Sequence, residues 1–336
     1  MTIFIRLCLL VLSFIGLGSC DLINHAYDIQ VSPHPPYSNS RMFWLNNDEI
    51  MFVGQDLFDT KKEKLNVYKW NVSNSKTEEI ISDVNGICYN RGYVRYGKKI
   101  SGTTTLFSGT MGKEQQEAIV NAGEYGSLTC KPVQANVHNF YDAPNPRFHL
   151  LQLLEEDGVL ELPPQLDNAT AYLHSQTSIK PKPIPKLNFW NTYGASNEFM
   201  YIPHLGAYLI SGQENGGKSY KLLYPNGSVV DYPIPDGNWD RNNTGSFSIL
   251  PVKNATIVVD WNNRENIFGK SMFFGRSHEP KGAYLVKNNN TTQIIPKDLI
   301  ISPLSISPNG CRVAFNYGEK KDFMEYKLGY VDVCNE

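Results

Sequence analysis

The chain has no excess of either charge, because 31 lysine and arginine residues stand against 33 aspartate and glutamate residues among 336. It also lacks a cluster of lysine or arginine, and without such a basic surface we expect no nucleic-acid partner. After the first 20 residues, no stretch is apolar for long enough to form a transmembrane helix. Attachment to a membrane would therefore depend on the N-terminal segment alone.

Common catalytic and cofactor motifs are missing as well. The sequence contains no Gly-x-Ser-x-Gly elbow, Walker loop, dinucleotide fingerprint, His-Glu-x-x-His or calcium-loop pattern. Its histidines are scattered and are expected to be single packed or exposed side chains, with a metal site built from several of them as the alternative. They are His25, His34, His138, His149, His174, His204 and His278. We expect no metal and no cofactor.

The N-terminal segment has the pattern of an export signal. Arg6 is the only charge in residues 1–20, residues 7–17 are a short apolar run, and Leu17-Gly18-Ser19-Cys20 ends it. These four residues resemble the bacterial lipobox, which implies a signal peptide over residues 1–19, a lipid on Cys20 and a tether over residues 20–28. The location implied is the bacterial cell envelope, on the exported side of a membrane. The alternative is cleavage after Gly18 and secretion, with Cys20 as a plain thiol.

The other cysteines agree with an exported protein. Cys8 lies in the signal segment, so that Cys88, Cys130, Cys311 and Cys334 remain besides Cys20. An even number in an oxidising compartment predicts two disulfides. Of the three pairings, we favour Cys88 with Cys130 and Cys311 with Cys334, because each pair then falls within one repeat. Free buried cysteines are the alternative.

Hairpins recur along the chain and predict an all-β fold. Short runs of β-branched and aromatic residues flank turns rich in Asn, Gly and Pro. First hairpins of a repeat are predicted at residues 42–53, 87–96, 199–210, 247–261 and 304–315. Second hairpins are predicted at residues 65–80, 150–162, 220–234 and 283–295. Two hairpins make a four-stranded antiparallel sheet, and repeated sheets of this size indicate the blades of a β-propeller.

We expect about six blades in a single propeller domain over residues 29–336. The third is the least regular: residues 137–147 make a poor hairpin, and residues 167–186, with three prolines, are predicted to be a connection or flap. The last unit has room for only one strand, residues 326–333, after its hairpin. Residues 29–31 could supply the missing strand, so that the chain ends pair and close the ring.

One repeat resembles a known family. Ile306-Ser-Pro-Asn-Gly-Cys-Arg-Val-Ala-Phe315 is similar to the Ser-Pro-Asp-Gly-x-x-Ile-Ala-Phe repeat of TolB-like propellers, with Asn309 in place of the usual Asp. The resemblance covers about a tenth of the chain. It implies a propeller used for protein interaction in the bacterial envelope, and it transfers no catalytic residue.

Two loops carry the side chains needed to hold a ligand. Each places a tryptophan beside an arginine, an acid and several amides, a set that can stack on a sugar or anchor a peptide. The candidate ligand-binding residues are Trp239, Asp240, Arg241, Trp261 and Arg264, with Trp190 as a weaker member. The alternative is tryptophans packed between blades beside solvated turn residues.

The sequence supports two functions. The preferred one is a lipid-anchored binding module whose propeller loops hold a protein or glycan partner. The alternative is a propeller enzyme acting on a polysaccharide, with Asp48, Glu198 and Asp260 as candidate acid and base, although these are more simply turn and strand-end residues. A catalytic role is therefore not preferred, and no catalytic residue is assigned.

Overall fold

The computed structural model of the chain describes much of the sequence between Tyr27 and Cys334. The described residues are 27–37, 40–55, 64–100, 102–120, 150–153, 159–162, 171–174, 180–184, 199–214, 217–237, 239, 247–260, 282–296, 299–319 and 326–334. Most of them lie in β-strands, and the short 3-10 helix Pro203–Leu205 forms part of a hairpin turn.

The strands form six four-stranded antiparallel sheets. The first and second sheets contain β2 (Met42–Trp44), β3 (Glu49–Gln55), β4 (Leu65–Asn71), β5 (Lys76–Ile81), and β6 (Val84–Asn90), β7 (Tyr93–Ile100), β8 (Thr103–Thr110), β9 (Gln115–Val120). The third and fourth contain β10 (Leu150–Leu153), β11 (Val159–Leu162), β12 (Ala171–His174), β13 (Lys182–Ile184), and β14 (Phe199–Ile202), β15 (Ala207–Glu214), β16 (Gly217–Leu223), β17 (Val229–Tyr232). The fifth and sixth contain β18 (Phe247–Val252), β19 (Ala255–Asp260), β20 (Ala283–Lys287), β21 (Asn290–Ile295), and β22 (Leu299–Ile306), β23 (Arg312–Glu319), β24 (Lys327–Asp332), β1 (Gln30–Val31).

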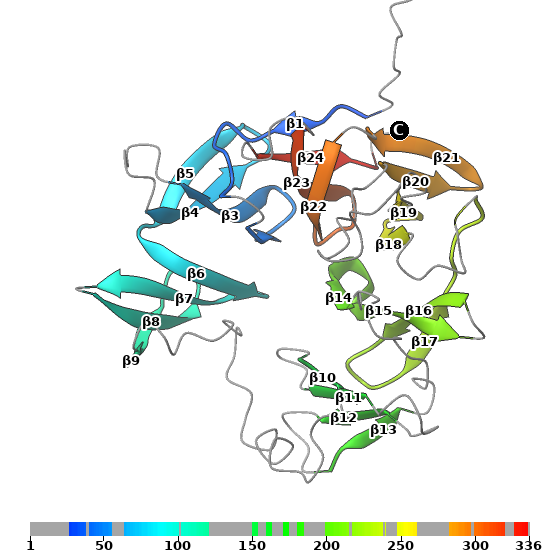
Figure 1. Cartoon of the computed structure of the whole chain (residues 1–336), viewed down its shortest axis with the longest axis horizontal. Helices are drawn as coiled ribbons and strands as arrows, with labels where there is room; N and C mark the ends of the chain where they lie inside the picture. The colour runs from blue at the N-terminus through cyan, green and yellow to red at the C-terminus, as the bar shows by residue number, and fades with distance from the viewer. Residues whose placement is uncertain are drawn as a thin grey trace, which may run out of the picture.

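The sheets are arranged around a common centre. In Figure 1 the first strand of each sheet lies toward this centre and the fourth lies toward the outside. The middle strands are buried on both faces, as β3 shows, where four consecutive residues from Ile50 to Val53 are each at most 8% exposed. A strand buried on both faces has a neighbouring sheet on each side. This radial order of antiparallel sheets is the architecture of a β-propeller.

The last sheet contains both ends of the described chain. Its order is β22, β23, β24, β1, so that the N-terminal strand occupies the outer position. Gln30 pairs with Tyr330 and Val31 with Gly329, and the backbone N–H of Ser32 donates to the Leu328 carbonyl at 2.8 Å. The predicted pairing of residues 29–31 with the C-terminal strand is present, and it covers the edge of β24.

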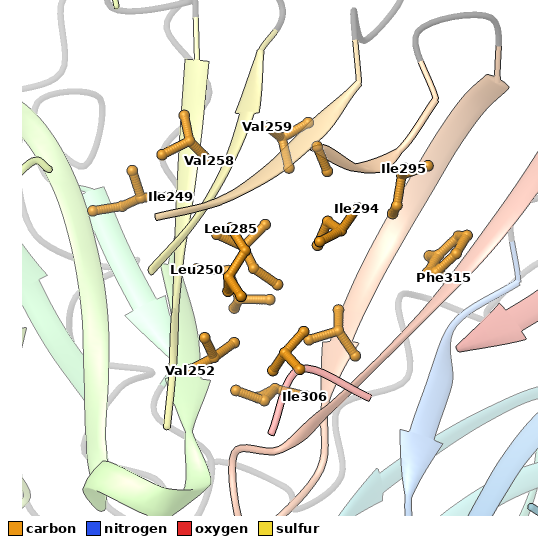
Figure 2. Close-up of a cluster of buried hydrophobic side chains, with 14 of the residues drawn as sticks. Ile249, Leu250, Val252, Val258, Val259, Leu285, Ile294, Ile295, Ile306 and Phe315 are labelled. Carbon is orange, nitrogen blue, oxygen red and sulfur yellow. The ribbon is translucent and has the colours of Figure 1, made fainter. Parts of the chain in front are cut away.

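Apolar side chains fill the space between neighbouring sheets. Figure 2 shows this between the fifth and sixth sheets, where side chains from β18 to β21 meet those from β22 and β23. Leu250, Leu285 and Ile294 are each at most 2% exposed, and Phe315 is fully buried. Burying one such side chain contributes about 1.5–3 kcal/mol. The packing between sheets is therefore the main source of stability.

Most of the predicted hairpins are confirmed, but the predicted assignment of strands in the third unit is wrong. Residues 150–162, predicted as a second hairpin, are the first two strands, β10 and β11, of the third sheet. Residues 167–186, predicted as a connection, contain β12 and β13. Pro183 is compatible with β13 because this strand lies at the edge of its sheet, where a proline needs no partner on its free side. In the second sheet, β8 and β9 were not predicted.

The cysteines fall in two groups. Cys311 and Cys334 form a disulfide, which is the pairing favoured from the sequence. It joins the turn before β23 to the residues after β24. Cys88 is 5% exposed on β6 and takes part in a disulfide, whereas its predicted partner Cys130 and the predicted lipid site Cys20 lie outside the described residues.

Candidate functional site

The turns that join the first and second strands of the sheets lie on one face. The backbone N–H of Asn309 donates to the side-chain oxygen of Asn47, 2.9 Å away, which joins the β22–β23 turn to the β2–β3 turn. The N–H of Lys253, in the β18–β19 turn, donates to the Gly310 carbonyl at 2.9 Å. We call this side the hairpin-turn face. Because successive strands are antiparallel, the connections between sheets, and those between second and third strands, lie on the opposite side, which we call the loop face.

Arg312 connects the first and last sheets on the hairpin-turn face. Its Nη1 donates to the Asn47 carbonyl at 2.6 Å and to Asp48 Oδ1 at 2.7 Å, and its Nε donates to Asp332 Oδ2 at 3.1 Å. Hydrogen bonds from Arg312 and from Ser73, whose Oγ is 2.9 Å from Asp48 Oδ1, lower the pKa of Asp48. A carboxylate held ionised in this way joins the sheets and is unsuited to donate a proton.

A buried lysine lies at the loop face, between the fourth and fifth sheets. Lys218 is the second residue of β16 and is only 7% exposed. Its ammonium donates a hydrogen bond to the carbonyl of Phe247, the first residue of β18. The nitrogen lies 5.2 Å from the ring centroid of Tyr220 and 5.1 Å from that of Phe247. Lysine is almost never buried without such compensation, and here the contacts with the ammonium group come from a carbonyl and two aromatic rings.

Aromatic rings extend from Lys218 toward the fifth sheet. The ring of Trp239 lies 6.4 Å from that of Phe247 and 5.9 Å from that of Tyr284, the second residue of β20. Its Nε1 is buried and has no hydrogen-bond partner in the part of the chain that the structure describes. We call Lys218, Tyr220, Trp239, Phe247 and Tyr284 the lysine–aromatic cluster. It combines a cation with ring faces at the ends of strands from two sheets.

Of the candidate ligand-binding residues, only Trp239 is described, and it is packed against rings of the fifth sheet. Asp240, Arg241, Trp261 and Arg264 lie outside the described residues. The strands that carry both loops are nevertheless described: Phe247 at the start of β18 pairs with Asp260 at the end of β19. The loop before Phe247 and the loop after Asp260 therefore leave the same edge of one sheet, beside Lys218.

The candidate acid and base residues do not converge. Asp48 lies on the hairpin-turn face, in the ion pair with Arg312. Asp260 ends β19 at the loop face, where its N–H donates to the Gly282 carbonyl at 3.1 Å. Glu198 lies outside the described residues. Because Asp48 and Asp260 are on opposite faces, they cannot act together on one glycosidic bond.

Sequence reasoning missed Lys218, although a signal was present. In the strand Gly-Lys-Ser-Tyr-Lys-Leu-Leu, Lys218 alternates with Tyr220 and Leu222 on one face. A lysine at an apolar-face position marks either a buried ion pair or a functional cation. No group of three metal-binding side chains occurs within the described ranges. Among the described residues, no helix is long and apolar enough to cross a membrane.

Comparison with known proteins finds propellers at low similarity. Neither a protein family model nor a curated protein sequence matches the chain. Among solved structures, streptogramin B lyase is 9% identical, with 91% of this chain and 97% of that one covered and a TM-score of 0.43. Oligogalacturonate lyase from Vibrio parahaemolyticus is 11% identical, with 91% and 96% covered and a TM-score of 0.42. Arabinanase Arb43A from Bacillus subtilis is 10% identical, with 91% and 97% covered and a TM-score of 0.35.

Proposed function

We propose that the chain is a lipid-anchored binding module of the bacterial cell envelope, built as one closed six-bladed propeller. In this proposal residues 1–19 are the signal peptide, residues 20–28 are the tether and residues 29–336 are the propeller. The lipobox-like Leu17-Gly18-Ser19-Cys20 supports the anchor, and the pairing of β1 with β24 supports closure. The Ser307-Pro-Asn-Gly turn supports a relation to TolB-like propellers.

The proposed ligand site is the lysine–aromatic cluster with the two tryptophan loops above it. The observation that carries it is the position of Lys218, a buried cation beside the paired strand ends from which both loops leave. Loops that leave the sheet beside a fixed cation and aromatic rings can hold a protein or glycan partner by stacking and charge-assisted hydrogen bonds. The binding function is preferred to the enzyme because the two described candidate carboxylates, Asp48 and Asp260, lie on opposite faces.

The site is tested by retention of envelope components on the immobilised protein. Two pools are applied separately, solubilised envelope proteins and purified surface polysaccharide, and are compared between the unchanged protein and Lys218→Met. Loss of one charged hydrogen bond predicts binding at least about tenfold weaker. Lys221→Met is the matched control, since Lys221 is also buried on β16, 4% exposed, and pairs with Asp231 at 2.7 Å. Equal retention by both variants would contradict the site.

The anchor is tested separately, by metabolic labelling with a radioactive fatty acid. The full chain expressed in a bacterium should incorporate the label, and Cys20→Ala should not. Label that persists in Cys20→Ala would show that Cys20 is not the acylated residue.

A further inference from the structure

The N-terminal segment enters the propeller from a defined side. In the last sheet Arg312, at the start of β23, pairs with Asp332, at the end of β24, beside the β22–β23 turn. Gln30 pairs with Tyr330, and Val31 pairs with Gly329, farther from that turn. The chain in β1 therefore runs away from the hairpin-turn face, and the residues that precede Gln30 approach from it.

The chain is held in place from Tyr27 onward. Tyr27 is 8% exposed and belongs to the core cluster between the fifth and sixth sheets. Ile29 packs against the same cluster, and its Cγ2 lies 2.9 Å from the position that a Cβ on Gly329 would occupy. Any movement of the N-terminal segment relative to the propeller is therefore confined to residues before Tyr27.

This leaves a short connection to Cys20. The seven residue steps from Cys20 to Tyr27 span at most about 25 Å when fully extended. An eight-residue strand is itself about 26 Å long, so that the tether can reach along a sheet from one face to the other only when it is completely straight. A straight tether has the lowest conformational entropy. A lipid on Cys20 is thus held near the face at which the chain enters.

We infer that the hairpin-turn face is turned toward the membrane surface and that the loop face, with the lysine–aromatic cluster, is turned away from it. This inference rests on the proposed lipid on Cys20. The turns placed toward the lipid headgroups carry many uncharged amides together with charged side chains of both signs, among them Asp48, Arg312 and Lys253. The turn asparagines are Asn46, Asn47, Asn74, Asn226, Asn254, Asn288, Asn289 and Asn309. Such a surface is compatible with a neutral headgroup layer, and the tether alone sets the orientation.

The consequence concerns the partner. A ligand bound at the loop face would be held on the far side of the propeller, about one strand length from the hairpin-turn face. The site is therefore presented to a soluble partner, or to a surface opposite the membrane, and a lipid headgroup of the anchoring membrane is the wrong ligand for it.

Two serines at opposite ends of one strand provide the test. Ser75 lies in the β4–β5 turn, which the Ser73–Asp48 hydrogen bond places on the hairpin-turn face. Ser82 follows β5 at the loop face, and both serines are exposed. They are separated by seven residue steps, about 23 Å. The substitutions Ser75→Cys and Ser82→Cys are nearly isosteric. Each variant is labelled with a thiol-reactive fluorophore without a reducing agent, so that the disulfides stay intact. The unsubstituted protein, treated in the same way, gives the background labelling.

The labelled, acylated full chain is reconstituted into phosphatidylcholine vesicles that carry a headgroup nitroxide quencher. We expect quenching at Ser75→Cys to be at least about threefold stronger than at Ser82→Cys, because collisional quenching requires near contact and the two positions differ by a strand length. Equal quenching, or stronger quenching at Ser82→Cys, would overturn the inferred orientation.

A second measurement separates the orientation from the anchor. The chain from residue 20, with Cys20→Ser so that the tether carries no thiol to be labelled, is produced with an N-terminal histidine tag and bound to nickel-chelating lipid, which tethers the same residue without acylation. The same order of quenching is expected, and the reverse order would overturn the orientation whatever the state of Cys20. If the proposed anchor is wrong, the full chain carries no fatty-acid label. In that case only the histidine-tagged protein floats with the vesicles.

Discussion

Arg312 bonds three groups in two chain segments through one guanidinium group. It bonds the Asn47 carbonyl and Asp48 of the first sheet and Asp332 of the last, with 23% of its side chain exposed. A methionine keeps the aliphatic stem and removes every one of these hydrogen bonds. Hydrogen bonds to charged groups contribute about 1.5–3 kcal/mol when buried and less when exposed, so that we expect Arg312→Met to lower the free energy of unfolding by about 2 kcal/mol.

Urea unfolding measures this, with Arg95→Met as the control. Arg95 makes a two-point contact with Glu117, at 2.8 Å for each bond, within a single sheet.

The contribution of the Arg312–Asp48 pair to stability also depends on pH. Since the pKa of Asp48 is lowered in the folded state, its stabilisation is present above about pH 4 and is lost as the pH falls through the lowered pKa. An unchanged unfolding midpoint in Arg312→Met would show that the sheets are joined without this group.

His204 is a second residue with a pH-dependent contribution. Neither ring nitrogen is exposed, and neither makes a hydrogen bond of good geometry among the described residues. Burial lowers the pKa of His204, and a weaker interaction with the Val252 backbone opposes this effect. As the pH falls below about 6.5, the unfolded chain binds the proton first. Stability is thus complete above that pH and decreases as the pH falls toward the lowered folded-state pKa.

We expect the melting temperature to fall between pH 7.5 and pH 5 and the fall to be smaller in His204→Leu, which cannot titrate. Scanning calorimetry across this range measures the difference. Equal slopes in the two proteins would show that His204 is not protonated differently on unfolding.

At the scale of elements, the turns of the hairpin-turn face differ in what surrounds them. Gly92 and Gly310 both have positive φ, 87° and 76°. A Cβ at Gly92 would meet nothing within 4 Å, whereas a Cβ at Gly310 would lie 2.7 Å from His204 Cγ. Alanine in this backbone region costs about 1–2 kcal/mol on its own. Gly92→Ala should show this cost alone, and Gly310→Ala should show the added displacement of the histidine.

A double-mutant cycle isolates the contact between the two turns. In a His204→Ala background, Gly310→Ala should cost about as much as Gly92→Ala, because the ring is gone and only backbone strain remains. Denaturant unfolding of the four proteins measures the coupling. No coupling between Gly310 and His204 would mean that the turns pack independently of each other.

The same turns explain which elements the sequence could predict. Pro225-Asn226-Gly227, Asn288-Asn289 and Pro308-Asn309-Gly310 each carry a residue of positive φ at the reversal, at Gly227, at Asn288 and Asn289, and at Gly310. Turn chemistry is local and is written in adjacent residues. In the third sheet the sequence between β10 and β11 carries Asp157-Gly158, and this hairpin was predicted. The sequence between β12 and β13 contains neither Asn nor Gly, so that these two strands were missed and the hairpin was assigned to the wrong half of its sheet.

At the scale of the whole molecule, the ring order and the closing pair could be predicted, but the candidate site could not. The closing pair was deduced from a missing strand in the last repeat. Lys218 and Phe247 are 29 residues apart in the sequence and lie in different sheets. No pattern of neighbouring residues predicts a contact over such a sequence separation. The tryptophan loops were recognised by composition, whereas the cation beside them required the arrangement of two sheets.

Pairing of β1 with β24 matters to the whole molecule, because β1 occupies the outer position of the described last sheet and covers the edge of β24. Removing residues up to 32 exposes the edge of β24 and takes Tyr27 out of the core, whereas removing residues up to 26 leaves both in place. An unpaired edge strand is a template for association with another chain. We expect the longer deletion to self-associate and to unfold at lower urea concentration than the shorter one, as measured by light scattering coupled to gel filtration and by urea titration. If both deletions had the same mass and midpoint, the two-residue strand would be dispensable and the ring would be held by the contacts between β2 and β22, such as the 3.1 Å bond from Trp44 Nε1 to the Ser305 carbonyl.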